Sequence, residues 1–377
     1  MLDGWITSLD AKNLEIECHD HRVIVFRCND NTKKAEALSS GDYVQVEATE
    51  DDRGFFTATS VAKGKNPPVR EVTARPTPAD GETASAPAPV SSAMVKPPDA
   101  SDPEDEGPPQ LKRGIPKPSR LPVAKAAEEQ AEPPGETASA AAPPSSTSAA
   151  ASMIDRARAS SESFLNGLPN YICQQFTTRY FSEGRPLSWK PKDVVSAEVV
   201  YQDGKERYEK LAIDGKPVKG AIKDTGTWST GEFATILSDL FSPSTHADFH
   251  FAGERSTAGQ SAMVYKYEVE LSYSHWKVEV ASQSVRPAYK GAVWIAKDSA
   301  RVLRIEIQAV KLPAEFPNDT VETAIDYGWV NLGTDKFLLP TRAEMLACFR
   351  GTSTCMRNVV EFRTYRKFSG KSNITFE

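Results

Sequence analysis

Residues 292–307 read AVWIAKDSARVLRIEI, and this stretch decides the fold. An apolar run precedes the turn formed by Lys297-Asp298-Ser299, and Leu303, Ile305 and Ile307 alternate with charged or polar residues after it. A period of two places alternate side chains on opposite faces of a β-strand, so that one face is buried and the other is polar. The stretch therefore predicts an antiparallel hairpin with one apolar face.

The same period recurs between Tyr171 and Glu377, for example in residues 263–269 and 276–280. We expect a long antiparallel sheet there, interrupted by one short helix. Such a sheet hides its apolar face either by closing on itself or by curling around a hydrophobic guest. The fold class is therefore mainly β.

Two helices are expected to cover this sheet, one over residues 152–168 and one over residues 230–241. Ser229 and Glu232 stand at capping-box spacing before the second. The apolar positions recur every three or four residues: Ile154, Ala157, Phe164, Leu165 and Leu168 in the first helix, and Phe233, Ile236, Leu237, Leu240 and Phe241 in the second. These stripes either face a core or form a lid over a ligand cavity.

Residues 65–151 differ in composition from both flanking regions. Of the 27 prolines in the chain, 18 lie between Val61 and Ala150, and no aromatic residue occurs from Lys65 to Ser163. Such a stretch buries too little apolar surface to offset the ordering of its backbone, roughly 1–2 kcal/mol per residue. The composition predicts a disordered linker with an r.m.s. reach of about 50 Å.

Residues 1–64 alternate as five short strands between polar turns, which predicts a small β-barrel. Leu38 followed by Gly41-Asp42-Tyr43-Val44-Gln45-Val46 resembles a step in the OB-like domains of bacterial envelope proteins. OB-type barrels that bind single-stranded nucleic acid use basic grooves and stacking aromatics. These 64 residues carry 7 basic and 12 acidic side chains. We therefore expect no nucleic acid as a partner and consider a protein partner for this barrel instead.

Cys348 and Cys355 flank a turn-like hexapeptide, residues 349–354, between two alternating runs. The alternation places both sulfurs on the same, non-core side of the predicted hairpin. Opposed residues of an antiparallel pair have Cα atoms ~4.5–5.5 Å apart, which a disulfide can span. We predict this disulfide, with two reduced thiols beside a loop as the alternative. Cys173 is expected to be buried, and Cys18 and Cys28 have no assigned role.

A disulfide indicates an oxidising compartment. The residues after Met1 lack the basic start and apolar run of a signal peptide, which taken literally indicates a cytoplasmic protein. The predicted disulfide favours a periplasmic or otherwise exported protein whose start site is truncated or whose export route the sequence does not reveal. No stretch approaches the ~20 apolar residues of a membrane-spanning helix.

Motifs for catalysis and for binding of metals or phosphates are weak. Gly370-Lys371-Ser372 is similar to the end of a phosphate-binding loop, but no glycine stands five residues before Gly370, where the motif needs its first one. His246 and His250, four residues apart on a predicted strand, lie about 13 Å apart, too far for one ion. No nucleophile motif occurs. We expect no catalytic residue, no metal and no cofactor, and hence no enzyme.

The order of elements in residues 152–377 resembles the lipoprotein-carrier superfamily of the bacterial periplasm, which comprises the lipoprotein-localisation factors and their lipid-binding relatives. The segments that carry the resemblance are residues 211–218, 292–297 with 301–306, 327–330 and 337–344. The resemblance implies a curved, unclosed sheet around an apolar cavity that helices cover. The region also resembles uncharacterised exported bacterial proteins, which adds no activity.

We therefore expect a non-enzymatic envelope protein that binds an acyl chain or a lipoprotein anchor in its half-barrel. The alternative is a ligand-free interaction scaffold with a filled core. Ligand pockets are lined mainly by apolar and aromatic side chains. The candidate cavity residues are Phe233, Ile236, Leu237, Leu240, Tyr265, Tyr267, Trp294 and Trp329.

Overall fold

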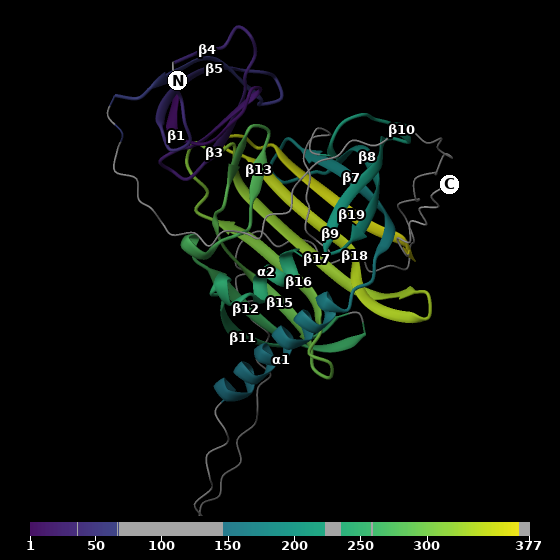
Figure 1. Ribbon diagram of the computed structural model, residues 1–377. Helices are drawn as coiled ribbons and strands as arrows, with labels where there is room; N and C mark the ends of the chain where they lie inside the picture. The colour runs from purple at the N-terminus through teal and green to yellow at the C-terminus, as the bar shows by residue number, and fades with distance from the viewer. Residues whose placement is uncertain (36, 66, 68–145, 223–234, 258, 369–377) are drawn as a thin grey trace, which may run out of the picture.

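The computed structural model describes residues 1–35, 37–65, 67, 146–222, 235–257 and 259–368, and for residues 146–152 only the backbone. This part of the chain forms an eight-stranded and an eleven-stranded sheet with two α-helices (Figure 1). Most of the predicted linker, residues 68–145, lies outside it. Neither of the described α-helices combines the length and the apolarity needed to cross a bilayer.

Residues 2–63 form a small barrel, as their alternation predicted. Its strands are β1 (Leu2–Leu9), β2 (Asn13–Glu17), β3 (Val23–Arg27), β4 (Lys33–Lys34), β5 (Tyr43–Glu50) and β6 (Phe56–Lys63). They pair in the order β3-β2-β1-β5-β6-β4, and the barrel closes where β3 meets β6 in parallel through Phe26↔Phe56 and Arg27↔Thr57. This β3–β6 seam is short, with two residue pairs.

The remaining described residues form the large sheet, its helices and one hairpin. The first elements are α1 (Ser146–Asn166), β7 (Tyr171–Ser182), β8 (Lys190–Gln202), β9 (Lys205–Ile213), β10 (Lys216–Pro217), α2 (Thr235–Phe241) and the 3-10 turn η2 (Pro243–Thr245). Next come β11 (Asp248–Thr257), β12 (Gln260–Val269), the 3-10 turn η3 (Leu271–Tyr273), β13 (Val278–Val280) and β14 (Gln283–Val285). The last are β15 (Ala288–Ala296), β16 (Val302–Val310), β17 (Asn318–Leu332), β18 (Asp335–Phe349) and β19 (Cys355–Lys367).

The large sheet is antiparallel and open. Its strands follow the order β10-β9-β8-β7-β19-β18-β17-β16-β15-β12-β11, so that β10 and β11 are its free edges among the described residues. Asp203-Gly204 and Asp214-Gly215, both predicted to be tight turns, have positive φ at both residues, as a type I′ hairpin requires. The predicted curved half-barrel is confirmed.

One row of side chains shows which face of the sheet is apolar. The strand register places eight residues side by side across eight strands: Tyr265, Val293, Ile305, Ile325, Ala343, Val360, Thr177 and Val195. All eight are buried, and only Thr177 lacks a largely apolar side chain. Alternate residues of a strand share a face, so this row identifies the inner face of the sheet.

Both α-helices lie on the inner face (Figure 1). Helix α1 begins at Ser146, earlier than the predicted residues 152–168, and ends at Asn166. Residues 146–151 are serine, threonine and alanine, which continue a helix without adding to an apolar stripe, so the periodic signal starts late. Helix α2 occupies the second half of the predicted residues 230–241, and residues 230–234 lie outside the described part.

The barrel and the large sheet are in direct contact. The hairpin β13–β14 leaves the large sheet between β12 and β15 and pairs with β3 of the barrel through Gln283↔Ile24 and Ser284↔Val23. Figure 1 shows the barrel above one end of the sheet, away from α1. The sequence predicted a barrel tethered by a long linker, and this added contact follows from the hairpin.

Candidate functional site

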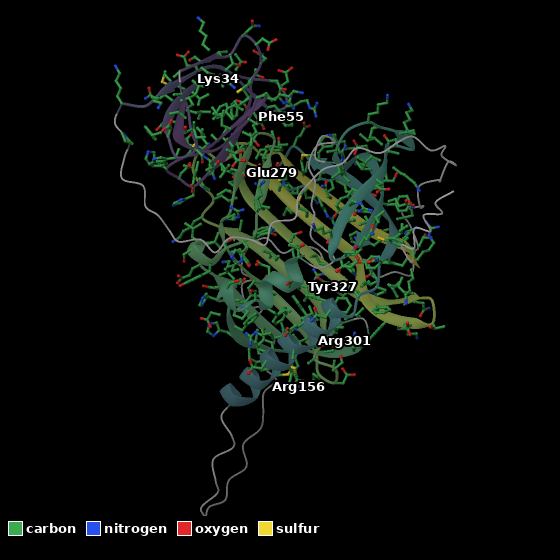
Figure 2. All side chains as sticks on the ribbon, viewed as in Figure 1. Lys34, Phe55, Arg156, Glu279, Arg301 and Tyr327 are labelled. Carbon is green, nitrogen blue, oxygen red and sulfur yellow. A yellow bond between two sulfur atoms is a disulfide. The ribbon has the colours of Figure 1, made fainter. Side chains whose placement is uncertain are left out.

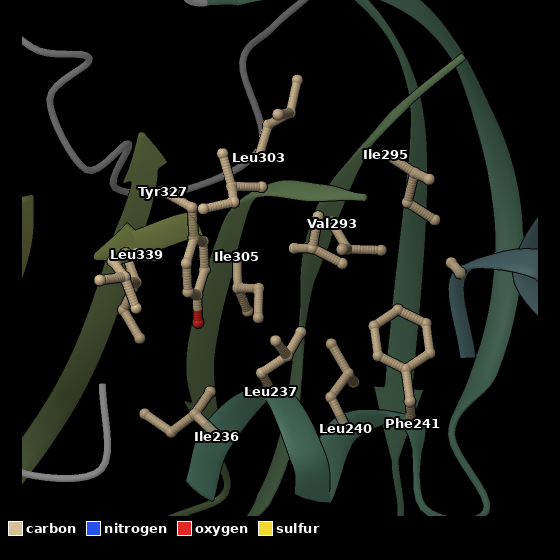
Figure 3. Packing of buried hydrophobic residues seen from close by; sticks show 14 of the residues in the cluster. Ile236, Leu237, Leu240, Phe241, Val293, Ile295, Leu303, Ile305, Tyr327 and Leu339 are labelled. Atoms are coloured by element: carbon tan, nitrogen blue, oxygen red, sulfur yellow. The ribbon is translucent and has the colours of Figure 1, made fainter. Parts of the chain in front are cut away.

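The inner face under the two helices is the candidate site. Figure 3 shows Leu237 and Leu240 of α2 facing Val293 and Ile305 of the sheet. Helix α1 adds buried Met153, Ile154 and Ala157, with Phe164 and Leu168 packing beside them. These side chains belong to one apolar cluster that extends from β7 to β12.

Side chains fill the space between the helices and the sheet. A pocket of about 10 Å³ lies there, lined by Ser160, Ser161, Phe164, Leu237, Arg301, Val302, Tyr327 and Leu338. A volume of this size holds about one water molecule. At this pocket the side chains leave no room for an acyl chain, which fits there only if a helix moves away.

The predicted cavity residues fall into three groups. Ile236, Leu237 and Leu240 are buried on α2, and Tyr265 and Tyr267 are buried on the inner face of β12. These five come together in the apolar cluster, and their role as cavity residues stays a prediction. Phe233 lies outside the described residues.

Trp294 and Trp329 do not line the covered space. The chain neighbours of Trp294, Val293 and Ile295, point to the helices (Figure 3), so Trp294 points to the opposite face, where the Arg304 guanidinium lies 5.6 Å from its ring centroid. Trp329 is 48 % exposed beyond the bulge that follows Asp326, with Arg301 5.1 Å from its ring centroid. Figure 2 shows Arg301 near Tyr327, at the end of the sheet remote from the barrel.

Tyr267 connects three strands across the inner face. Its hydroxyl donates a 2.8 Å hydrogen bond to the Glu306 carbonyl oxygen on β16, passing over Gly291 on β15. A Cβ at Gly291 would lie 2.7 Å from this hydroxyl and 1.8 Å from the Glu306 carbonyl oxygen, so only glycine fits. Burial raises the pKa of Tyr267 well above its ordinary value, which keeps the phenol neutral and able to donate.

A polar knot holds the end of α2. The Asp239 carboxylate contacts His275 Nδ1 at 2.7 Å and accepts hydrogen bonds from Thr245 Oγ1 at 3.2 Å and Tyr289 OH at 3.4 Å. Thr245 Oγ1 also donates to the Asp239 carbonyl oxygen at 2.6 Å. Burial first, and then the Asp239 charge, raise the pKa of Tyr289, so that its hydroxyl stays protonated.

Sequence reasoning missed this knot. Asp239 lies between Leu237 and Leu240 in the apolar stripe of α2, and a carboxylate in such a stripe indicates a buried partner. His275 comes from a segment that is distant in sequence, so no spacing rule connects the two residues. The charge of Asp239 within an apolar stripe could have indicated this site from the sequence. Its partner, His275, could be identified only from the folded structure.

The inner face becomes polar toward β7. Arg179 is buried and pairs with Asp193 through contacts of 2.5 and 2.6 Å, beside buried Gln175, Thr177 and Asn358. Opposite charges in close, hydrogen-bonded contact are how a protein accommodates buried ions. No three His, Cys, Asp or Glu side chains converge as metal ligands within the described residues.

The outer face carries paired charges across the strands. Arg304 is buried with Asp326 at 2.5 Å and Glu306 at 3.0 Å. Glu322 accepts a 3.2 Å hydrogen bond from Gln308 Nε2. Burial, and then the neighbouring Glu306 carboxylate, raise the pKa of Glu322 to about 7. This is the one group on the outer face whose charge changes near neutral pH, among those whose shift is resolved in the described residues.

The predicted disulfide joins Cys348 and Cys355, which are opposed in the β18–β19 register. Both lie on the outer face, as predicted, and they are buried there beside Leu346, with Leu187 and Trp189 packed against them. Cys173 is buried and free, as are Cys18 and Cys28. Burial, as the largest influence, raises the pKa of the Cys18 thiol to about 12, so it stays protonated near neutral pH.

Comparison with known proteins begins with the sequence. No protein-family model matches this chain, and no curated protein matches it significantly.

Solved structures do match it, over about 60 % of the chain. A domain described as an outer membrane lipoprotein-sorting protein from Vibrio parahaemolyticus has 11 % identity and a TM-score of 0.33, with 59 % of this chain and 95 % of that one covered. A DUF1329 family protein from Desulfovibrio piger has 9 % identity and a TM-score of 0.30, with 60 % and 97 % covered.

A LolA superfamily protein from Nitrosomonas europaea has 10 % identity and a TM-score of 0.28, with 60 % of this chain and 97 % of that one covered. These solved structures thus include lipoprotein carriers, the class of protein that the sequence resembles. At these identities and TM-scores, nothing about ligand or partner follows from it.

Proposed function

We propose that this protein is a non-enzymatic member of the bacterial cell envelope that binds one hydrophobic chain, from a lipid or a lipoprotein anchor, on the inner face. The observation that carries the proposal is an apolar face of an open sheet whose centre is covered by α2, of which the structure describes Thr235–Phe241. This part of α2 contacts the sheet through four buried apolar side chains, Ile236, Leu237, Leu240 and Phe241. A ligand of similar apolar area can replace these contacts, so α2 can act as a removable cover.

The ligand replaces the α2 side chains, because the pocket of about 10 Å³ has no room for both. Uncovering Ile236, Leu237, Leu240 and Phe241 costs about 6–12 kcal/mol, at roughly 1.5–3 kcal/mol for each side chain. Burial of a ligand gives back about 0.8 kcal/mol per CH₂, so about 8–15 methylenes balance the exchange. Acyl chains of ordinary membrane lipids have this length.

The exported location is part of the proposal. A disulfide between Cys348 and Cys355 persists in an oxidising compartment and is rare in the cytoplasm. Alkylation of the intact protein without reductant tests this point. Labelling of both cysteines in protein taken directly from cells would remove the support for export.

Binding is tested by native mass spectrometry of envelope-purified protein and by titration with a fluorescent fatty acid. We expect one probe per chain, displaced by unlabelled fatty acids in a chain-length series. The affinity should rise about fourfold per methylene, the equivalent of about 0.8 kcal/mol, until the inner face is filled. Lys290→Ala is the matched control, because Lys290 is exposed on β15 and its loss should leave binding unchanged.

A second candidate function has its own support. The filled interior favours a ligand-free scaffold whose surfaces bind other proteins. Protein that carries no lipid and refuses the probe at every chain length would refute the carrier and favour the scaffold. A plateau of affinity that does not depend on chain length would also refute binding on the inner face.

A further inference from the structure

Residues 270–287, called the insert, connect β12 to β15. These two strands already pair with each other as far as Val269↔Tyr289, so a short turn would be enough to join them. The insert instead contains η3, the segment 274–277 and the hairpin β13–β14. Its base lies beside α2 and its tip lies in the barrel.

The base of the insert holds α2. His275 Nδ1 lies 2.7 Å from Asp239 Oδ1, which makes this pair the shortest contact of the polar knot between α2 and the insert. The next residue, Trp276, packs edge-to-face on Tyr289 with ring centroids 5.7 Å apart. Because Tyr289 also donates to Asp239, the insert and β15 hold the same carboxylate from two sides.

The tip of the insert completes the seam of the barrel. Ser282 accepts a 2.8 Å hydrogen bond from Val25 N–H on β3 through its carbonyl oxygen, and a 2.9 Å hydrogen bond from Phe56 N–H on β6 through its hydroxyl. Ser282 therefore bridges the two strands that are joined by only two residue pairs of their own. This is strand addition at an exposed edge, a recurring mode of peptide recognition.

Arg22 fixes the tip from the barrel side. Its guanidinium is buried and donates to Gln283 Oε1 at 2.8 Å and to the Glu315 carbonyl oxygen at 3.1 Å. Glu315 precedes Phe316, which packs with Val278 and Val285 of the hairpin. Arg22 of the barrel thus contacts both the hairpin and the segment that leads into β17 of the large sheet.

The base and the tip of the insert are connected by a short, packed segment. His275 at the base and Val278 at the first strand of the hairpin are three residues apart, and Trp276 between them contacts the apolar clusters on both sides. The described part of α2, Thr235–Phe241, is held at its end by the Asp239 contacts, so its position depends on them.

We propose that the N-terminal barrel is a docking module for the insert, and that its docking keeps α2 over the inner face. With the barrel docked, the insert holds Asp239 and the site is covered. With the barrel undocked, the insert loosens, α2 loses its anchor and the inner face opens. The opening as a route for a ligand rests on the proposed function, whereas the coupling between barrel and helix does not.

The test is amide hydrogen exchange on the full chain, followed region by region. The double variant Arg22→Ala/Ser282→Ala removes the guanidinium contacts and the Phe56 N–H acceptor. We expect exchange of the hairpin and of α2 to quicken together, by tenfold or more, while β16–β18 stay protected. Lys12→Ala, which removes an exposed cation from the same barrel, is the matched control and should change neither region.

A variant at the other end of the insert guards against unfolding of the barrel. Asp239→Ala removes the carboxylate that contacts His275, Thr245 and Tyr289, and it leaves the barrel untouched. Exchange of α2 should quicken while the hairpin stays protected. A hairpin that is released with α2 unchanged in the first variant would overturn the coupling.

A fluorescent fatty acid separates the two proposals. If the undocked variant binds the probe at least tenfold more tightly than the wild type, the coupling reaches the ligand site. If α2 exchange quickens and neither protein binds the probe, the coupling stands and the carrier function fails. If both proteins bind equally and α2 exchange is unchanged, the carrier function stands and the coupling fails.

Discussion

Leu237→Ala separates a removable cover from a permanent core. Leu237 is 3 % exposed and lies in the middle of α2, facing the inner face (Figure 3). Truncation of a buried leucine to alanine costs about 2–5 kcal/mol, through lost burial and the cavity left behind. If α2 is a cover, this loss falls on the covered form only.

The consequence for binding is calculable. A shift of about 2–3 kcal/mol between the covered and uncovered forms raises the uncovered fraction by roughly 30- to 150-fold. The apparent Kd of a probe that binds only the uncovered form falls by the same factor, until the uncovered form dominates. The melting temperature falls at the same time, by roughly 4–12 °C.

The matched control is Ile305→Ala, on the opposite side of the same contact. Ile305 is fully buried on the inner face, so its truncation costs a similar amount of stability. Its loss weakens the covered form and the ligand-bound form alike, because both α2 and a ligand pack against it. We expect its Kd to change by only a few-fold.

The assay is probe titration together with thermal unfolding of both variants. Opposed behaviour, a much lower Kd for Leu237→Ala and a nearly constant Kd for Ile305→Ala at similar loss of melting temperature, is the expected result. Equal changes of affinity in the two variants would refute the idea that α2 and the ligand compete for one surface.

Three further predictions concern stability. Glu322 binds its proton more tightly in the folded state, so folding stability falls as the pH rises from about 4.5 to about 7; Glu322→Gln should add roughly 2–3 kcal/mol at pH 8 and little at pH 4. Urea unfolding at both pH values checks this, and an unchanged pH slope would contradict it. Replacing Cys348 and Cys355 by serine should cost about 2–3 kcal/mol, because the closed loop is short, and reduced wild type should unfold like the variant. Gly291→Ala should destabilise more than Tyr267→Phe, since it drives a Cβ into the β16 backbone; comparable melting temperatures for the two would disprove that reasoning.

The periodicity of apolar residues was enough to predict the sheet and the barrel, and it placed five candidate residues of α2 and β12 in the apolar cluster; their role in a ligand cavity stays a prediction. It failed at Trp294, because residues 292–296 are all apolar and a period of two cannot be read from an unbroken run. The face of Trp294 is set by the β15–β16 register, which places it opposite Arg304. That register depends on the bulge between Trp294 and Ile295, which no residue pattern in the sequence predicts.

The docking of the barrel could not be read from the sequence either. The strands β13 and β14 have three residues each, too few for a pattern, and their partner β3 lies more than 200 positions earlier in the chain. Backbone hydrogen bonds need a free strand edge but no particular residue type. The contact between Ser282 and Val25 therefore leaves no pattern in the sequence. The disulfide was predictable because its two cysteines are close in sequence, and because the alternation of apolar residues on the two strands places both cysteines on the same face.

Among the described residues, the large sheet is open at β10 and β11, and this has a consequence for its radius. In a closed barrel, strand number and shear set the diameter, so the internal width is fixed by covalent sequence. A sheet whose ends never meet carries no such constraint, and small changes in twist along its strands alter its radius. The radius of this sheet is therefore adjustable and depends on what packs against it; if the protein binds a hydrophobic chain as proposed, we expect it to discriminate among ligands by length more sharply than by width.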